Sequence, residues 1–456
     1  MAKRIDLLSG SIISPLTRLA LPIMGTSLIQ MAYNMVDMIW VGRTGAGGVA
    51  AVGAAGMFMW LSGCLMVLAR MGGQVYTAQR LGAGDVEGAA RYTAAALQMG
   101  TAFSLLYMIA LVAGARPLIA FFNLNSPQVV EDAVIYLRIV GLGMFSSYIN
   151  QILSAIITTT GNSRTPFLTM AVGLGINFFL DPVLIFGLGP IPGMGVAGAA
   201  IATVLAQVIV TVIFWLYIRK DDHLFAHVRL LARPDFKVWG EIMKLSLPSA
   251  LQNAIFPLIS MVIARLIAGW GDDAVAVQKV GSQIESVAWM MADGFSVAVN
   301  SFIAQNVGAG NYQRAKKGYR VSMGIASVWG VFTTLLLVFA GGPIFGIFIP
   351  DPAIAPMGVG YLTIIGYCQL FVCWEYVTTG AYSGFGHTLT PSLVSIILTA
   401  LRIPGALLLS RTPLGLDGIW WSLSISAMCK GVLVVILFFF FLRRKEAARR
   451  REGLPV

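Results

Sequence analysis

The stretch at residues 79–85 reads QRLGAGD, and 226 positions later residues 305–311 read QNVGAGN. The same offset relates residues 17–22, TRLALP, to residues 243–248, MKLSLP. Neither pair would be convincing alone, because short glycine-rich or leucine-rich matches arise often by chance. Two pairs at one offset indicate instead that the second part of the chain repeats the first.

Two further matches follow in the same order along the chain. Residues 161–166, GNSRTP, correspond to residues 386–391, GHTLTP, and residues 195–198, GVAG, correspond to residues 415–418, GLDG. Four matches in one order predict that the chain arose by duplication of a unit of roughly half its length. Internal repeats of this kind are common in membrane transporters.

The composition places the chain in a membrane. Hydrophobic residues make up 57% of its 456 residues and charged residues 11%, whereas a soluble protein has about 25% charged residues. Apolar stretches of about 20 residues, the length that crosses a bilayer core as a helix, recur along the whole chain. Twelve spans are predicted, at residues 14–42, 49–78, 92–114, 131–158, 165–188, 195–218, 243–269, 275–304, 318–340, 357–383, 391–410 and 417–442.

Twelve spans and one duplication predict an all-α integral membrane protein with two pseudo-symmetric six-helix lobes. The expected parts are an N-terminal lobe at 1–218, a cytoplasmic linker at 219–242, a C-terminal lobe at 243–442 and a basic tail at 443–456. Because six is an even number, both lobes begin on the same side of the membrane, which makes the repeat a parallel one.

The basic residues determine the expected orientation. Loops after even-numbered spans hold more Lys and Arg than the others, so the positive-inside rule places both termini in the cytoplasm. The net charge of +11 could point to nucleic acid, but these bases lie in short loops and at residues 443–451, where they would meet anionic lipid headgroups. We therefore expect a multi-pass protein of the inner membrane that binds no nucleic acid.

Ionisable side chains inside a span are costly and mark candidate functional sites. Asp37 lies in the first span, on one helix face with Gln30 and Asn34, which precede it by seven and three residues. Gln30 and Asn34 are candidates for lining a polar cavity or contacting a substrate.

Asp181 is the second buried acid, in the fifth span, and Asn177 precedes it by one helical turn. Thr203, in the sixth span, could add a hydroxyl oxygen. Carboxylate, amide and hydroxyl oxygens suit a hard cation such as Na⁺, and two carboxylates in a dry site could instead share a proton. The alternative is that these side chains only tie helices together through hydrogen bonds.

The second half lacks these acids at the corresponding positions. By the offsets of the repeat, Asp37 corresponds to Ile263, Asn177 to Arg402 and Asp181 to Ala406. The coupling-ion site is therefore predicted in the first half only.

Other charges occupy the second half. Glu285, Trp289 and Asp293 recur every four residues along the eighth span, and Glu375 lies in the tenth. Acids and aromatic rings in a cavity would suit a lipophilic organic cation. Ion pairing inside the protein, for example between Glu375 and Arg402, explains these charges equally well.

Two prolines are candidates for helix bends, since proline removes a backbone donor and kinks a helix. Pro22 lies in the first span, and Pro182 directly follows Asp181. A bend at Pro182 could therefore respond to protonation or ion binding at Asp181. No metal motif, nucleophile–base set or cofactor motif accompanies these residues, so no cofactor is expected beyond a coupling H⁺ or Na⁺.

These residues resemble the multidrug and toxic compound extrusion (MATE) family over nearly the whole chain, through the twelve spans, the Q-x-x-GAG loops and the G-x-x-x-TP segments. Asp37, Asn177, Asp181 and Thr203 look like the ion site of its prokaryotic branch with a first-half aspartate. The resemblance implies a V-shaped pair of lobes, alternating access, and antiport of drugs or organic cations against H⁺ or Na⁺.

Three other functions are compatible with parts of the sequence. A lipid-linked oligosaccharide flippase of the same superfamily is the nearest, although such proteins usually have more spans and a cationic cavity. An intramembrane enzyme would need a nucleophile–base or metal pair, which the sequence lacks. A channel fits the duplication and the one-sided carboxylates less well than a carrier. We expect a monomeric carrier.

Overall fold

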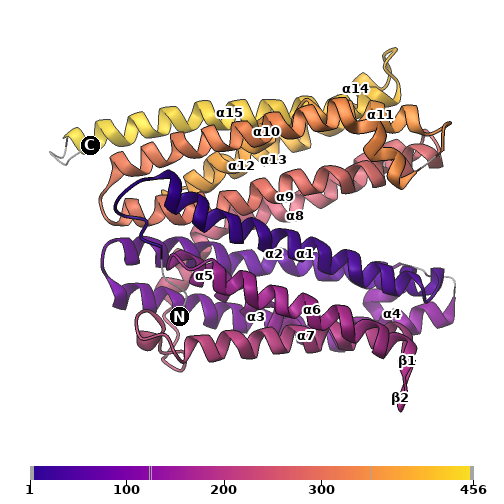
Figure 1. The fold of residues 1–456 in the computed structure, drawn as a ribbon, viewed down its shortest axis with the longest axis horizontal. Coiled ribbons are helices and arrows are strands. Elements are labelled where there is room, and N and C mark those ends of the chain that lie inside the picture. The colour runs from indigo at the N-terminus through magenta and orange to yellow at the C-terminus, as the bar shows by residue number, and fades with distance from the viewer. Residues whose placement is uncertain (1–4, 123, 125, 350, 452–456) are drawn as a thin grey trace. The chain divides into compact units, whose positions relative to one another are not determined.

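The computed structural model describes residues 5–122, 124, 126–349 and 351–451, without the side chains of Asn34, Ala46 and Ile191. Helices dominate this part of the chain (Figure 1). The helices are α1 (Ile13–Gly42), α2 (Ala46–Gly82), α3 (Val86–Ala120), α4 (Pro127–Leu142), α5 (Met144–Thr159), α6 (Arg164–Phe186), α7 (Gly195–Ile218), the 3₁₀ helix η1 (Phe225–His227), α8 (Phe236–Ala268), α9 (Asp272–Gly308), α10 (Tyr312–Phe348), α11 (Ala355–Gly366), α12 (Gln369–Gly384), α13 (Leu389–Ala400), α14 (Arg402–Leu409) and α15 (Leu416–Arg451). The described residues also contain one antiparallel hairpin with two residues in each strand, β1 (Gly187–Leu188) and β2 (Ile191–Pro192).

The helices account for the predicted spans, and the all-α fold is confirmed. Ten stretches among the described residues are long and apolar enough to cross a membrane, with α13 and α14 forming one of them. A further span is the pair α11 and α12, bent by 43°. The predicted fourth span consists of α4 and α5, 16 residues each, which meet at Gly143 and together reach the required length.

The backbone repeats along with the sequence. Both GAG loops form tight turns between helices, with Gly84 at φ 75° and Gly310 at φ 74°, a conformation that glycine adopts without strain. Gly161 and Gly386, 225 positions apart, have φ 82° and 74°. The duplication is therefore visible in the backbone.

The fourth repeat match has a packing reason. A Cβ atom at Gly198 in α7 would collide with the carbonyl oxygen of Leu184 in α6, and one at Gly418 in α15 would collide with that of Leu409 in α14. In each half, glycine is required because one helix crosses the backbone of another at close range, as small residues allow in membrane proteins.

This close approach gives a first prediction. Gly198→Ala should lower the stability of the protein by about 1–3 kcal/mol, because a backbone carbonyl cannot move aside as a side chain can. Gly240→Ala in α8 is the matched control, since a Cβ there meets nothing within 4 Å; it should be neutral or stabilise by up to about 1 kcal/mol. Thermal unfolding in detergent measures both, and equal melting temperatures for the two variants would contradict the prediction.

The chain forms two compact units. Unit 1 contains residues 1–6 and 25–250, and unit 2 contains residues 7–24 and 251–456. Residues 7–24 group with unit 2, where Arg314 donates to the carbonyl oxygens of Leu7, Ser9 and Gly10. The expected lobe limits at 218 and 243 differ from these borders and stay a prediction.

Each unit has its own apolar interior. In unit 1, α3, α5 and α7 contribute buried residues such as Ala96, Ile152 and Phe214 to one core cluster. In unit 2, Tyr361 and Trp420 are buried at the centre of another. Many large apolar side chains are exposed instead, which fits helices that face lipid rather than water.

Candidate functional site

The first-half acids lie on two different helices of unit 1. Asp181 and Asn177 are fully buried on α6, and the Asn177 side-chain amide donates to Asp181 Oδ1 at 3.1 Å. Asp37 is half-buried on α1, and Thr203 is half-buried on α7, the helix that packs along α6. The spacing of one helical turn predicted from the sequence thus places Asn177 and Asp181 in direct contact.

All four of these residues hold a buried oxygen that finds no hydrogen-bond donor among the residues that the structure describes. The atoms are Asp37 Oδ1, Asn177 Oδ1, Asp181 Oδ2 and Thr203 Oγ1. A buried oxygen without a partner costs free energy, and more so in a lipid-embedded protein, where water is scarce. Helix-tying side chains would be expected to satisfy one another, so the surplus of acceptors favours a bound cation or proton.

The two acids lie close enough for the charge of one to act on the other. The carboxyl groups of Asp37 and Asp181 interact with one another, and both interact with the hydroxyl groups of Tyr33 on α1 and Tyr136 on α4. The Tyr33 hydroxyl donates to the Thr203 carbonyl oxygen at 3.5 Å. The structure therefore brings α1, α4, α6 and α7 together around two carboxyl groups.

Three side chains near these acids were missed from the sequence, although two of them carried a signal. Tyr33 lies four residues before Asp37, and Gln207, whose side chain acts on the Tyr33 hydroxyl, lies four residues after Thr203. The helical period that grouped Asn177 with Asp181 could have found both. Tyr136 could have been found only through its repeat partner Tyr361, 225 positions later.

The atoms of this cluster determine which ligands it can bind. Two carboxyl groups, an amide oxygen and a hydroxyl oxygen form an all-oxygen set, which suits a hard cation. The same two carboxyl groups could share one proton, because two nearby negative charges repel. No cluster of three or more His, Cys, Asp or Glu that could hold a metal ion occurs in the described ranges.

The remaining first-half candidates lie on α1 and α6, the helices that carry Asp37 and Asp181. Gln30 is half-buried on α1, and the side chain of Asn34 lies outside the described residues. Pro22 lies inside α1 and Pro182 inside α6, and both helices continue through the proline. Their role as bending points stays a prediction.

In unit 2, Glu375 on α12 is part of a buried ion pair. Its partner is Lys430 on α15, with N–O distances of 3.0 and 3.1 Å and side chains that are 12% and 8% exposed. Ser395 also donates to Glu375 at 3.2 Å. The expected example of a pair between Glu375 and Arg402 is corrected: the Arg402 Nε donates to the Ser426 hydroxyl instead, at 3.2 Å.

The three candidates on α9 have different surroundings. Glu285 accepts a hydrogen bond from Tyr361 at 3.1 Å, Trp289 is half-buried and Asp293 is exposed. Both acids, together with Glu375, interact electrostatically with Tyr376 on α12. Glu285 and Glu375 thus accept hydrogen bonds from Tyr361 and from Lys430 and Ser395, whereas Asp37 Oδ1 and Asp181 Oδ2 have no donor among the described residues.

Comparisons with known proteins agree with this architecture. A family model described as MatE matches residues 22–183 and again residues 248–408, so the two halves match it separately. The chain is 28% identical to a probable multidrug resistance protein NorM of Thermotoga maritima over 411 residues, covering 89% of this chain and 87% of that protein. It is 26% identical to an FAD transporter of Shewanella oneidensis, covering 95% of each.

A solved structure shares the fold. It is described as a MOP superfamily transporter from Pyrococcus furiosus whose binding pocket of reverse polarity suggests a different function. The TM-score is 0.88 at 23% sequence identity, covering 97% of this chain and 98% of that one.

Proposed function

The chain belongs to the MatE family of membrane transporters, and from that membership we propose that it exports organic cations in exchange for inward-moving protons or sodium ions. As a family member it is a multi-pass transporter and not an enzyme. Relatives named multidrug resistance proteins support multidrug efflux as its activity.

The observation that carries the proposal is the set of four buried oxygens, on Asp37, Asn177, Asp181 and Thr203, that have no hydrogen-bond partner in the part of the chain that the structure describes. A cation or proton that binds them removes the cost of burying them and neutralises the repulsion between the two acids. Binding and release of this small ion is then linked to the conformation of the half that holds it. Transport follows if the conformation that releases the ion inside is also the one that admits the organic cation.

Unit 2 offers acids to a substrate without offering an ion site. Glu285 and Asp293, with Tyr376 and Trp289 nearby on α12 and α9, combine negative charge with aromatic rings, which attracts lipophilic cations. Glu375 already has Lys430 as its counter-ion. An ion site in unit 1 and a substrate site in unit 2 agree with the repeat, because the second half has no acid at the positions that correspond to Asp37 and Asp181.

We place the protein in the inner membrane as a monomer, with both termini in the cytoplasm. The support is the excess of Lys and Arg in the loops that share a side with the basic tail, residues 443–451. Protease removal of that tail in inside-out vesicles, and its protection in intact cells, would report the orientation.

The test is ethidium transport by the purified protein in proteoliposomes under separately imposed proton and sodium gradients. A hundredfold ion gradient supplies about 2.7 kcal/mol, enough for about hundredfold accumulation of ethidium at one-to-one exchange. We expect one of the two gradients to drive ethidium accumulation against its own gradient. Transport that ignores both gradients would refute antiport.

The substrate class is tested in the same vesicles. One relative is named an FAD transporter, so FAD is offered in parallel with ethidium. Transport of FAD without transport of ethidium would overturn the proposal that the substrates are organic cations. Movement of a lipid-linked oligosaccharide across the bilayer, with no ethidium transport, would instead favour the flippase alternative.

A further inference from the structure

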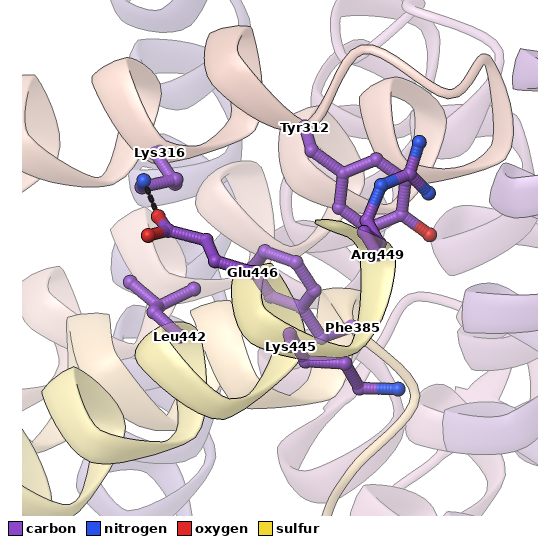
Figure 2. A pocket seen from close by; sticks show the side chains of 7 residues that line it. All are labelled: Tyr312, Lys316, Phe385, Leu442, Lys445, Glu446 and Arg449. Carbon is purple, nitrogen blue, oxygen red and sulfur yellow. Dashed lines mark ion pairs between the residues drawn. The ribbon is translucent and has the colours of Figure 1, made fainter. Parts of the chain in front are cut away.

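Two charged side chains on α15 have partners of opposite charge inside unit 2. Near the end of the helix, Glu446 forms an ion pair with Lys316 on α10, as Figure 2 shows. Within the span, Lys430 pairs with Glu375 on α12. Arg402, the first residue of α14, differs from both, because it forms no ion pair with any acid in the described ranges. Its hydrogen bond goes to a serine instead.

Arg402 is attached to α15 through the part of the residue nearest its backbone. Its Nε donates to the Ser426 hydroxyl at 3.2 Å, and its carbonyl oxygen accepts from Ser422 at 2.9 Å. The guanidinium carbon lies 5.9 Å from the centre of the Phe256 ring on α8, within the range of a cation–π contact. A guanidinium has five N–H donors. The four on its terminal nitrogens find no acceptor in the part of the chain that the structure describes, so they can bind a ligand.

The position of Arg402 in the membrane restricts what its guanidinium can face. Arg402 lies inside the 21-residue apolar span Leu389–Leu409, seven residues before its end, and its side chain is half-buried. A charged side chain at this depth is too costly to expose to lipid, and such residues face a bundle interior or a water-filled space. The open part of the guanidinium is therefore expected to face water or a ligand.

Two acids act on Arg402 from a distance. Glu375 and Glu285 both interact with its charge, but neither forms an ion pair with it among the described residues. Each acid has a donor of its own, since Lys430 binds Glu375 and Tyr361 donates to Glu285 at 3.1 Å. Glu285 and Arg402 thus form the negative and the positive end of a dipole. Because opposite charges are held apart there, a ligand that carries both charges would be stabilised by both ends.

The repeat shows that this position has changed its charge between the halves. Arg402 corresponds to Asn177, and Ala406, which is buried, corresponds to Asp181. In unit 1, Asn177 and Asp181 present buried acceptor oxygens without donors among the described residues. In unit 2, the same position presents donors instead. The two halves therefore suit ligand groups of opposite charge at this place in the fold.

We propose that Arg402 binds a carboxylate of the transported substrate, so that the substrates include zwitterions, which are aromatic cations that also carry a carboxylate. The carboxylate accepts two hydrogen bonds from the planar guanidinium, and the cationic end lies toward Glu285. An anion without a positive group is less suited, because Glu285 and Glu375 repel it. The cationic end of this substrate rests on the proposed function, and Arg402 adds a site for the second charge.

The experiment compares three dyes that share one ring system. Rhodamine 110 carries a cationic ring and a free carboxylate, rhodamine 123 is its methyl ester without that carboxylate, and fluorescein keeps the carboxylate but has no cationic amine. Fluorescence anisotropy measures their dissociation constants for the purified full chain in detergent at neutral pH. We expect the wild-type protein to bind the rhodamine acid and the rhodamine ester, and we expect fluorescein to bind much more weakly than either.

Arg402→Met should weaken binding of the rhodamine acid by about 30-fold, the effect of losing charge-assisted hydrogen bonds. Binding of the ester should be unchanged or tighter, because a nearby positive charge is gone; its retention also establishes that the variant is folded. Arg402→Lys keeps the charge without the planar pair of donors and should lie between the two. Arg265→Met is the matched control, since Arg265 on α8 is exposed, and it should leave binding of both rhodamines unchanged.

The outcomes separate this site from the proposed function. Equal weakening of both rhodamines by Arg402→Met would overturn the carboxylate site, because it would mean that Arg402 only stabilises the helices around it. Fluorescein binding as tight as that of the rhodamine acid would overturn the assignment to zwitterions in favour of a plain anion site. Binding of the ester without the acid by the wild-type protein would overturn the carboxylate site and leave export of organic cations intact. Binding of neither rhodamine would overturn both.

Discussion

Asp181→Asn should abolish gradient-driven efflux of ethidium, and Asp37→Asn should do the same, with each variant inserted in the membrane in normal amounts. The amide keeps the size of the side chain but removes the negative charge that attracts the coupling ion and the site at which a proton could be carried. Loss of the link between ion and substrate is worth up to about 3 kcal/mol, so coupled efflux should fall by about 100-fold. Ethidium efflux from vesicles under an imposed gradient measures it.

The same variants separate a transport role from a packing role. Because Asp37 Oδ1 and Asp181 Oδ2 have no donor among the described residues, neither substitution breaks a hydrogen bond from those atoms, and the melting temperature should hold or rise as charge repulsion is relieved. A fall in melting temperature together with normal efflux would mean that the acids only tie helices together. Asp85→Asn is the matched control, since Asp85 accepts from the Gly88 amide at the start of α3 and Asn caps helices equally well.

Lys430→Met should destabilise the protein by about 3–5 kcal/mol, the usual cost of leaving one member of a buried ion pair without its partner. Glu375 would then remain as a carboxylate in the interior of unit 2, with the Ser395 hydroxyl as its remaining hydrogen-bond donor among the described residues. Thermal unfolding of the purified protein in detergent measures the loss. Lys279→Met on α9 is the control, because Lys279 is exposed and its replacement should change stability by less than about 0.5 kcal/mol.

A second substitution should reverse most of that loss. Glu375→Gln combined with Lys430→Met removes both charges and should restore stability to within about 1 kcal/mol, since replacing a whole buried pair is often neutral. If the double variant were as unstable as Lys430→Met alone, the ion pair would not be what holds α12 to α15. The repeat supports this interpretation: Asn150, 225 positions before Glu375, donates to the Gln207 side chain at 2.9 Å and accepts from Thr211, both on α7, so unit 1 makes the same helix-to-helix link without charge.

The proposed ion coupling and the observed ion pair thus both follow the asymmetry between the halves. In unit 1, the link between α5 and α7 is neutral and the acids on α1 and α6 keep unpartnered oxygens. In unit 2, the equivalent link carries the charges of Glu375 and Lys430, and the positions of Asp37 and Asp181 have become apolar. Lys430 neutralises the charge of Glu375 permanently. We propose that an exchangeable ion neutralises Asp37 and Asp181 in the same way.

The sequence by itself determined the helical membrane fold, the duplication and the candidate ion site, because each depends on local or periodic information. Apolar runs of about 20 residues specify spans, and a spacing of four placed Asn177 beside Asp181 on one helix face. The break at Gly143 was not predicted, since it does not interrupt an apolar run. The hairpin of β1 and β2 was not predicted either, because it lies where two predicted spans are joined and hydropathy specifies no structure for such a connection.

The tertiary structure alone decided which side chains of different helices meet. Hydropathy gives the length of a helix but not its rotation about its own axis, so the sequence could not tell that Glu375 meets Lys430 rather than Arg402, or that Tyr136 faces the acids of α1 and α6. It also could not show that four buried oxygens lack donors among the residues described here, because satisfaction of a hydrogen-bonding group depends on every neighbour in space and not on spacing along one helix.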